Sequence, residues 1–595
     1  QQDIETCHVA LLNLAEEFRT KQPPDLKSSL QCLMAVLNLP VYDRIAAKTN
    51  LQIGNLIYHH STDPNNAQVY FERAYEHTNS GNAPDIRFEV VSILADIYIA
   101  QDQLYACKQL LSKSVEESRV IQGHLYWHYK FLFKLSQLHL NDKEFLSAAT
   151  LLANGAETTR LTDDLYTRVL FLLSKGMVMM IARKYQDPMY NQQIANSQEQ
   201  IIDHVQQLAE TLTLAGNLLE HWPGDSSAKE ALKVFFLVLQ VCHHLNGGCV
   251  KNAKPCLRLL QQSIQSLTNA LENPGPNTGV MRPDERFSWL PKDSMCVLVY
   301  LITVIHSMQA GFLDKAQKYT EKALTQIERL RAVEPNQLLE TFQVLLLEHM
   351  SMCRLVMGHK SIAIKEIVQA LQLCYHGNPR LKVRHRGNVH MLLGLYAISM
   401  SLPDDAENHL KRVISDNNVG SELRIMSMLN LALCYLRTRK ETELNELLPR
   451  LNPETLTSPP ISICLKAAAY YVYGLNAFTQ TRYNDAKRHL RETLKLANGE
   501  DLNRLTSCSL VLLGNIFYNL GNQRESMNMV IPGMQLASKI PDIHVQLWAA
   551  ALLKDLYNGF DQQRHMEAIN MHQNFSQLLY NDQYQAALLP EHNYL

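Results

Sequence analysis

Cysteine and histidine are the residues of this sequence whose spacing comes closest to a metal site. Cys242, Cys249 and Cys256 recur every seven residues, which would place three thiols near one helical stripe. The 12 cysteines include no CxxC pair, and no pair of histidines completes a zinc-binding spacing. The adjacent histidines at 59–60 and 243–244 point apart on a helix. We therefore interpret the cysteines as free thiols in a reducing compartment and expect no metal site.

The sequence motifs of the common enzyme classes do not occur in this chain. We find no GxxxxGK[ST], GxGxxG, GxSxG or HExxH segment. Aspartate and glutamate residues lie mostly at positions that should face solvent on helices. We expect a protein that is not an enzyme, with no cofactor and no small-molecule ligand.

Two rows of basic residues could bind an acidic or phosphorylated partner, because an arginine side chain can donate two parallel hydrogen bonds to one phosphate group. We place the first row in a short link before a helix and the second along one helix face. Rows of this kind are more often simply solvated. The residues are Arg380, Lys382, Arg384 and Arg386 in the first row, and Lys487, Arg488, Arg491 and Lys495 in the second.

The overall composition favours a folded protein without a membrane segment. Of the 595 residues, 46% are hydrophobic and 19% are charged, and the net charge is −2. This balance argues against direct binding of nucleic acid, which remains an alternative. The longest apolar runs, Val234–Leu239 and Val297–Ile302, are far shorter than a bilayer span. The N-terminus also shows no secretory signal, so we expect a soluble intracellular protein.

A spacing of small and apolar residues repeats about every 40 positions and indicates the elements that position these side chains. Gaps of twelve, four and three residues relate a small residue to three later ones. They occur in Ala95–Cys107–Leu111–Ser114, Gly394–Ala406–Leu410–Val413 and Gly474–Ala486–Leu490–Thr493. This is the spacing of the tetratricopeptide repeat, a helix–turn–helix unit. Each unit needs its neighbour to cover an apolar face, so the units stack into a superhelix.

The repeat predicts an all-α tetratricopeptide superhelix, or α-solenoid, of about 13–14 helix–turn–helix units. We expect an N-terminal array over residues 1–272 and a C-terminal array over 294–595. A polar, Asn/Gln-rich stretch at 186–200 should form an exposed insert. Residues 273–293 carry four prolines and two glycines, and therefore predict a loop between the arrays.

The first helix of each unit should line the concave face, and places two, five, nine and twelve of the repeat should point into it. Places five and twelve are mostly apolar, and place nine is apolar in the middle units. An exposed apolar groove of this kind would promote aggregation unless a partner polypeptide occupied it. The alternative is that the superhelix buries these residues against its own helices. The candidate groove residues are Phe133, Leu140, Met391, Leu395, Ile398, Met426, Leu429, Leu433, Leu436, Tyr471, Leu475, Phe478, Val511 and Tyr518.

Several segments are distinctive beyond any repeat consensus. They are SWLPKDSMCVLVYLITVIHSMQAG (288–311), FLLSKGM (171–177), VFFLVLQV (234–241), RYNDAKRHLRETLKLANGEDLNRL (482–505), MHQNFSQ (571–577) and LPEHN (589–593). Together they resemble the Mau family, the tetratricopeptide-repeat subunit of the cohesin-loading complex, along nearly the whole chain.

This resemblance implies a function. The superhelix would wrap the extended N-terminal segment of a Nipped-B-type HEAT-repeat adherin as an obligate heterodimer. The pair would help load cohesin onto chromatin in the nucleus for sister chromatid cohesion, with contacts to cohesin and chromatin made indirectly. The ATP chemistry would belong to cohesin. A scaffold subunit of another large assembly, such as a ubiquitin ligase or signalosome, is the alternative.

Overall fold

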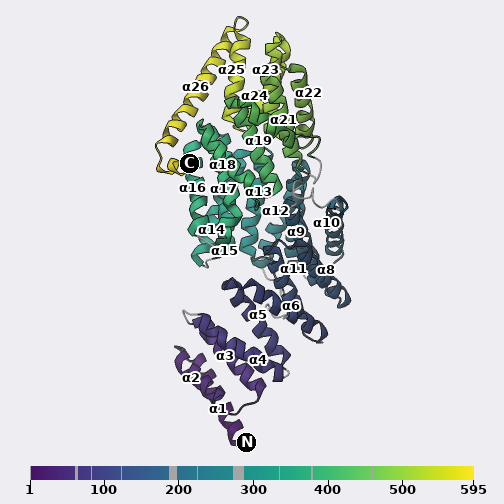
Figure 1. Ribbon diagram of the computed structural model, residues 1–595, viewed down its shortest axis with the longest axis vertical. Helices are drawn as coiled ribbons and strands as arrows, with labels where there is room; N and C mark the ends of the chain where they lie inside the picture. The colour runs from purple at the N-terminus through teal and green to yellow at the C-terminus, as the bar shows by residue number, and fades with distance from the viewer. Residues whose placement is uncertain are drawn as a thin grey trace. The chain divides into compact units, whose positions relative to one another are not determined.

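The computed structural model describes most of the chain. The described residues are 2–60, 64–81, 83–121, 123–185, 197–223, 226–272, 287–333, 336–376, 379–456 and 461–595. They form 26 α-helices and short 3-10 segments, with no strand in the described part of the chain. The helices follow one another as thirteen pairs, so the predicted all-α repeat fold is confirmed (Figure 1).

The helices of the first nine pairs are bounded as follows. They are α1 (Gln2–Thr20), α2 (Leu26–Leu37), α3 (Asp43–His60), α4 (Pro64–Gly81), α5 (Pro84–Ala100), α6 (Leu104–Val120), α7 (Leu125–Asn141), α8 (Phe145–Leu161), α9 (Leu165–Tyr185), α10 (Ser197–Glu220), α11 (Ser226–Gly247), α12 (Val250–Glu272), α13 (Lys292–Gln309), α14 (Leu313–Val333), α15 (Gln337–Val356), α16 (Lys360–His376), α17 (Pro379–Met400) and α18 (Pro403–Ser415).

The remaining helices complete the C-terminal array. They are α19 (Ser421–Thr438), α20 (Glu441–Leu447), α21 (Ile463–Thr479), α22 (Tyr483–Gly499), α23 (Asn503–Asn519), α24 (Gln523–Lys539), α25 (Ile543–Tyr557) and α26 (Gln562–Ala587).

The repeated small residue allows the two helices of a unit to approach closely. A Cβ atom added at Gly394 of α17 would meet the side chain of Leu410 at 3.0 Å and the carbonyl of Ala406 at 3.6 Å. The same two offsets recur in the next pairs, where Gly474 faces Leu490 at 3.1 Å. Larger side chains would hold the helices apart, which explains why the twelve-and-four spacing returns in successive units.

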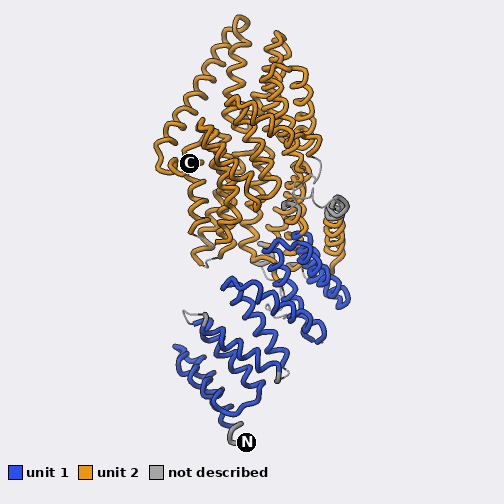
Figure 2. Tube along the Cα trace, in the orientation of Figure 1, with its two compact units in different colours: residues 1–178, 282–285 blue, residues 179–281, 286–595 orange. Residues whose placement is uncertain are grey.

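By its internal contacts the chain divides into two compact units, coloured separately in Figure 2. Unit 1 contains residues 1–178, and unit 2 contains residues 179–281 and 286–595. This division falls within α9 and differs from the boundary expected at 273–293. Of that expected loop, residues 273–286 lie outside the described residues, and α13 begins at Lys292.

The odd-numbered helices form the inner layer of the superhelix within unit 2. Neighbouring odd helices, such as α13 with α15, α15 with α17 and α19 with α21, pack on one another. In the described residues of unit 2, the even-numbered helices of successive pairs make few contacts or none. Helices that approach their neighbours more closely must lie on the side with the smaller radius. The odd helices therefore line the concave face, as the repeat predicts.

Unit 2 closes on itself after about five helix pairs. The turns after α11, α13 and α15 contact the N-terminal ends of α21, α23 and α25, about 200 residues later. Asn503 donates to the carbonyl of Ala310 at 2.7 Å, and His544 lies 3.3 Å from the carbonyl of Leu355. A Cβ at Gly248 would lie 2.8 Å from the backbone nitrogen of Cys464. We call this line of contacts, together with the contacts of α26 described next, the seam.

The last helix, α26, continues the seam along α16 and α17. The carboxylate of Asp582 accepts hydrogen bonds from the backbone nitrogen of Ser361 at 3.3 Å and from its hydroxyl at 2.6 Å. Gln583 donates to the carbonyl of Met400 at 3.1 Å. Asp582 therefore caps the first turn of α16 from a helix more than 200 residues away. The seam is thus held by specific polar contacts as well as by apolar packing.

Candidate partner-binding site

Three of the fourteen candidate groove residues are buried inside the protein's own core. Met391, Leu429 and Val511 are 3%, 5% and 0% exposed. All three occupy place five of the repeat and pack into core clusters of the superhelix. These residues cannot contact a partner directly, and for them the alternative of burial against the protein's own helices is correct.

The other candidates in unit 2 are half-buried, and most of them lie together. Five of them pack on one core cluster formed by α17 to α21, and three pack on the next cluster, formed by α21 to α23. These eight residues are Leu395, Ile398, Met426, Leu433, Leu436, Tyr471, Leu475 and Phe478. We call them the apolar strip. Tyr518 packs on a further cluster that includes residues of α25.

Two of the candidate groove residues, Phe133 and Leu140, lie in unit 1. The ring of Phe133 stacks on that of Phe171, with centroids 4.1 Å apart, and Leu140 is half-buried near the end of α7. Phe171 also fills the space beside Gly155 in the preceding pair. The role of Phe133 in packing therefore accounts for its apolar character.

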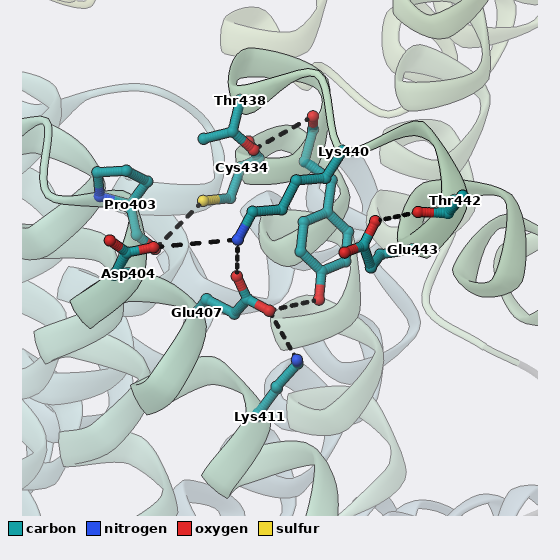
Figure 3. A network of polar contacts seen from close by, with 10 residues as sticks. Pro403, Asp404, Glu407, Lys411, Cys434, Thr438, Lys440, Thr442 and Glu443 are labelled. Carbon is teal, nitrogen blue, oxygen red and sulfur yellow. Dashed lines mark hydrogen bonds and ion pairs between the residues drawn. The ribbon is translucent and has the colours of Figure 1, made fainter.

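An ion cluster supports the helices that carry the apolar strip (Figure 3). The carboxylate of Glu407 on α18 lies 2.6 Å from Lys411 and 2.7 Å from Lys440, and accepts from the Tyr435 hydroxyl at 3.1 Å. Burial alone would raise the pKa of Glu407, but these three donors outweigh it and lower the pKa to about 2. Glu407 therefore remains ionised at neutral pH and joins α18 to the end of α19.

A groove with strongly basic walls lies along α14, and sequence reasoning did not identify it. Its volume is about 890 Å³, and Lys539 of α24 also lines it. Lys315, Lys318, Lys322 and Arg329 follow one face of α14, because their spacing of three, four and seven residues matches successive turns. This spacing was a signal that the sequence alone could have provided. We call these four residues and Lys539 the α14 groove bases.

The α14 groove bases are not neutralised by the protein itself. Only two acidic residues, Asp314 and Glu321, line the same groove. Within the described part of the chain, none of the five bases forms an ion pair. Lys315 and Lys322 lie over the ring of Tyr319, at 5.8 and 5.4 Å from its centroid. The groove therefore presents positive charge beside aromatic surface, which suits an acidic polypeptide.

The first predicted basic row is not in a link, as expected, but in the first turns of α17. Its residues are exposed. Because each helical residue turns by about 100°, Arg380 and Arg384 face away from Lys382 and Arg386. The Lys382 ammonium group lies 4.2 Å from the ring centroid of Tyr375. This row therefore does not form a single patch.

The second predicted row lies on α22, as expected. Arg488 is 3.9 Å from Asp485, and Lys495 is 4.0 Å from Glu492. Lys487 is half-buried and Arg491 is exposed, and neither lines the α14 groove. The row is consistent with a solvated helix face that carries its own counter-charges.

The three cysteines do not share one helical stripe, because Cys242 lies on α11 and Cys256 lies on α12. Over the described residues, no group of three His, Cys, Asp or Glu side chains is arranged to hold a metal ion. One helical window there, Leu165–Ala182 of α9, is long and apolar enough to span a bilayer. Most of this window is buried in the protein, as expected for a core helix. The polar insert expected at 186–200 lies outside the described residues up to residue 196, and residues 197–200 begin α10.

The repeat geometry and the apolar strip together define a class of protein. The chain is a tetratricopeptide-type α-solenoid whose concave face offers apolar side chains at several successive units, an architecture that serves protein–protein interaction.

Comparison with known proteins identifies the family. The family model described as cohesin loading factor matches residues 7–563, and the chain belongs to this family. It is 45% identical over 591 residues to a MAU2 chromatid cohesion factor homolog of Aedes aegypti, covering 99% of this chain and 91% of that protein. A MAU2 homolog of Drosophila willistoni is also 45% identical, covering 97% and 84%. The resemblance seen in the sequence is confirmed.

A solved structure shares the fold. The crystal structure of Scc4 in complex with Scc2n superposes with a TM-score of 0.58 at 10% sequence identity. The match covers 97% of this chain and 99% of that one. At this identity the likeness concerns the arrangement of the helices.

Proposed function

We propose that this chain is a non-enzymatic adaptor subunit of a cohesin loader in the nucleus. Its concave face holds the extended N-terminal segment of a Nipped-B-type HEAT-repeat subunit, and the pair supports the loading of cohesin onto chromatin. The observation that carries this proposal is the apolar strip on successive odd helices of unit 2. Scc4, which shares the fold, was crystallised with Scc2n, and this supports the same arrangement here.

The apolar strip favours a bound polypeptide over an empty surface. Its eight residues retain contact with solvent although each packs on a core cluster, so a covering segment would remove further apolar area from water. An extended segment can follow the strip from α17 to α21 and bury one side chain after another. Such a segment loses conformational freedom when it binds, and the binding energy must offset that cost.

The proposal predicts that the partner segment stabilises this chain against heat. A segment present at about one hundred times its dissociation constant adds about 2.7 kcal/mol to the stability of the folded state. Thermal unfolding of the purified chain, with and without the recombinant N-terminal segment, measures the shift in melting temperature. A scrambled segment of the same composition is the control. The proposal is wrong if the chain alone is monomeric and soluble and its melting temperature does not change with the segment.

A second binding function rests on the α14 groove bases. We propose that this groove receives an acidic or phosphorylated segment of a receptor protein that recruits the loader to chromatin. Charge complementarity supports this proposal, because five bases face two acids in a groove large enough for a peptide.

We expect that Lys315→Glu with Lys318→Glu and Lys322→Glu weakens binding of an acidic phosphopeptide by about tenfold or more. All three side chains are exposed, so the fold should be unaffected. Fluorescence anisotropy with a labelled peptide measures the affinity. A chain with Lys487→Glu, Arg488→Glu and Arg491→Glu is the matched control, with the same change of charge on α22. Equal weakening in both chains would show a general charge effect. Preferential binding of duplex DNA would replace the peptide proposal.

A further inference from the structure

Arg504 is an arginine on the inner face whose guanidinium group is only partly used by the protein. It lies in the first turn of α23, a helix of the inner layer, one turn before Cys508. Its side chain is 52% exposed. Its Nε donates to Asp542 at 2.7 Å, and within the described residues its two terminal nitrogens form no hydrogen bond. They remain available to an acceptor.

The partner of Arg504 holds it in a fixed place. The side chain of Asp542 is 1% exposed and also accepts a hydrogen bond from the backbone nitrogen of Val545 at 3.2 Å, which caps α25. A buried carboxylate bound at a helix start has little freedom to move. Burial alone would lower the pKa of Arg504, but Asp542 outweighs this effect and the pKa is raised. The guanidinium is therefore charged and oriented before any ligand arrives.

The surroundings of Arg504 favour an anion. His544 of α25 lies against the carbonyl of Leu355, and burial lowers its pKa, so that it is neutral at pH 7. Across the seam, Arg354 pairs with Glu366 at 3.5 Å, and burial raises the pKa of Glu366 to about 7 despite that pairing. At neutral pH Glu366 is therefore only partly ionised. The carboxylates near Arg354 and Arg504 thus do not fully neutralise the positive charge of these two arginines.

The neighbouring inner face is apolar. Burial raises the pKa of the Tyr471 hydroxyl on α21, and the hydroxyl is close enough to Arg504 and Asp542 that Arg504 opposes this shift and Asp542 adds to it. Tyr471, Leu475 and Phe478 belong to the apolar strip and continue along the same helix. The site therefore combines one oriented guanidinium with an apolar wall, a pattern that suits an acidic side chain flanked by apolar ones.

We propose that Arg504 anchors the partner segment by receiving the carboxylate of one of its Asp or Glu residues on its two terminal nitrogens. This inference rests on the proposed function, because it requires that a segment lies along the inner face. It adds a chemical requirement, which is an acidic residue within the apolar part of the segment. Arg504 thereby sets the register of the bound polypeptide, since a single buried charge pair is costly to misplace.

The experiment measures the affinity of the labelled N-terminal segment for the full-length chain and for Arg504→Gln and Arg504→Lys. We expect Arg504→Gln to weaken binding by about tenfold to a hundredfold. Arg504→Lys should weaken it less, because an ammonium group keeps the charge but loses the bidentate geometry. Arg488→Gln on α22 is the control and should bind like the wild type. Thermal unfolding of each free chain measures how much the Arg504–Asp542 pair contributes to the stability of the fold, separately from its effect on binding.

A second set of variants leaves this chain unchanged and so cannot misfold it. Each Asp and Glu of the segment is replaced in turn by Asn or Gln. One replacement should weaken binding to the wild type and have no further effect on binding to Arg504→Gln. If effects at every acidic position are additive with Arg504→Gln, or if Arg504→Gln binds like the wild type, the inference is overturned and the proposed function stands. If the wild type does not bind the segment, the proposed function itself fails.

Discussion

A chain carrying Leu433→Asp together with Leu436→Asp is expected to lose at least about a hundredfold in affinity for the partner segment while it retains its helical content. Both leucines lie on the same face of α19 and are half-buried in the apolar strip. In the free chain the new carboxylates can reach water. Beneath a bound segment they would lose that hydration without gaining a partner, and this loss opposes binding.

The matched control is Leu429→Asp, one turn earlier on the same helix. Leu429 is 5% exposed, so its replacement forces a carboxylate into the core and should destabilise the chain by about 3 kcal/mol or more. Circular dichroism separates the two cases, and isothermal titration with the segment gives the affinity. If Leu433→Asp with Leu436→Asp melts like the Leu429 variant, the strip is core and not a binding surface. Unchanged affinity in a folded double variant would contradict the proposed function.

Replacing Gly358 with valine is expected to open the seam and to destabilise unit 2 by about 2–5 kcal/mol. Gly358 has a φ of +83°, which a β-branched residue adopts only with strain. A Cβ there would also lie 2.7 Å from Ile543 and 2.9 Å from Leu579, both across the seam. The backbone strain and the clash add, because Ile543 and Leu579 must shift across the seam to make room for the new side chain.

Gly521→Val isolates the effect of the seam. Gly521 has a φ of +75° at an equivalent turn, but a Cβ there would meet nothing within 4 Å. This variant should therefore carry only the backbone strain, about 1–2 kcal/mol. Chemical denaturation measures both stabilities, and hydrogen exchange of the amides in α25 and α26 reports opening of the seam. Equal losses in the two variants would mean that the seam contributes nothing to stability.

The fold was predictable from the sequence because it depends on short offsets. Gly394, Ala406 and Leu410 meet within one helix pair, so their spacing alone specifies the contact. The seam could not be predicted in this way. Asn503 contacts Ala310 only because the small rotation between neighbouring units accumulates over about five units. No local sequence pattern specifies the total rotation.

The candidate site was predictable in kind but not residue by residue. Leu433 and Leu429 are both apolar and inward on the repeat, yet only the packing of adjacent odd helices decides that Leu429 is enclosed. The sequence predicts that Arg384 lies in a link before a helix, whereas α17 begins earlier, at Pro379. By contrast, the bases of α14 share one helix face although they are spread along the sequence. A search for basic residues that are adjacent in sequence therefore overlooks them.

The closed seam bears on how long a complex lasts. A polypeptide bound along the inner face of unit 2, as proposed, could not depart laterally through the seam. It could leave only lengthwise, past its own free end, or after the hydrogen bonds between Asp582 and α16 break. The dissociation rate of the proposed partner would then be limited by this release step, and the same barrier would slow its association. For a partner with a large folded body at one end, assembly must begin from the other terminus.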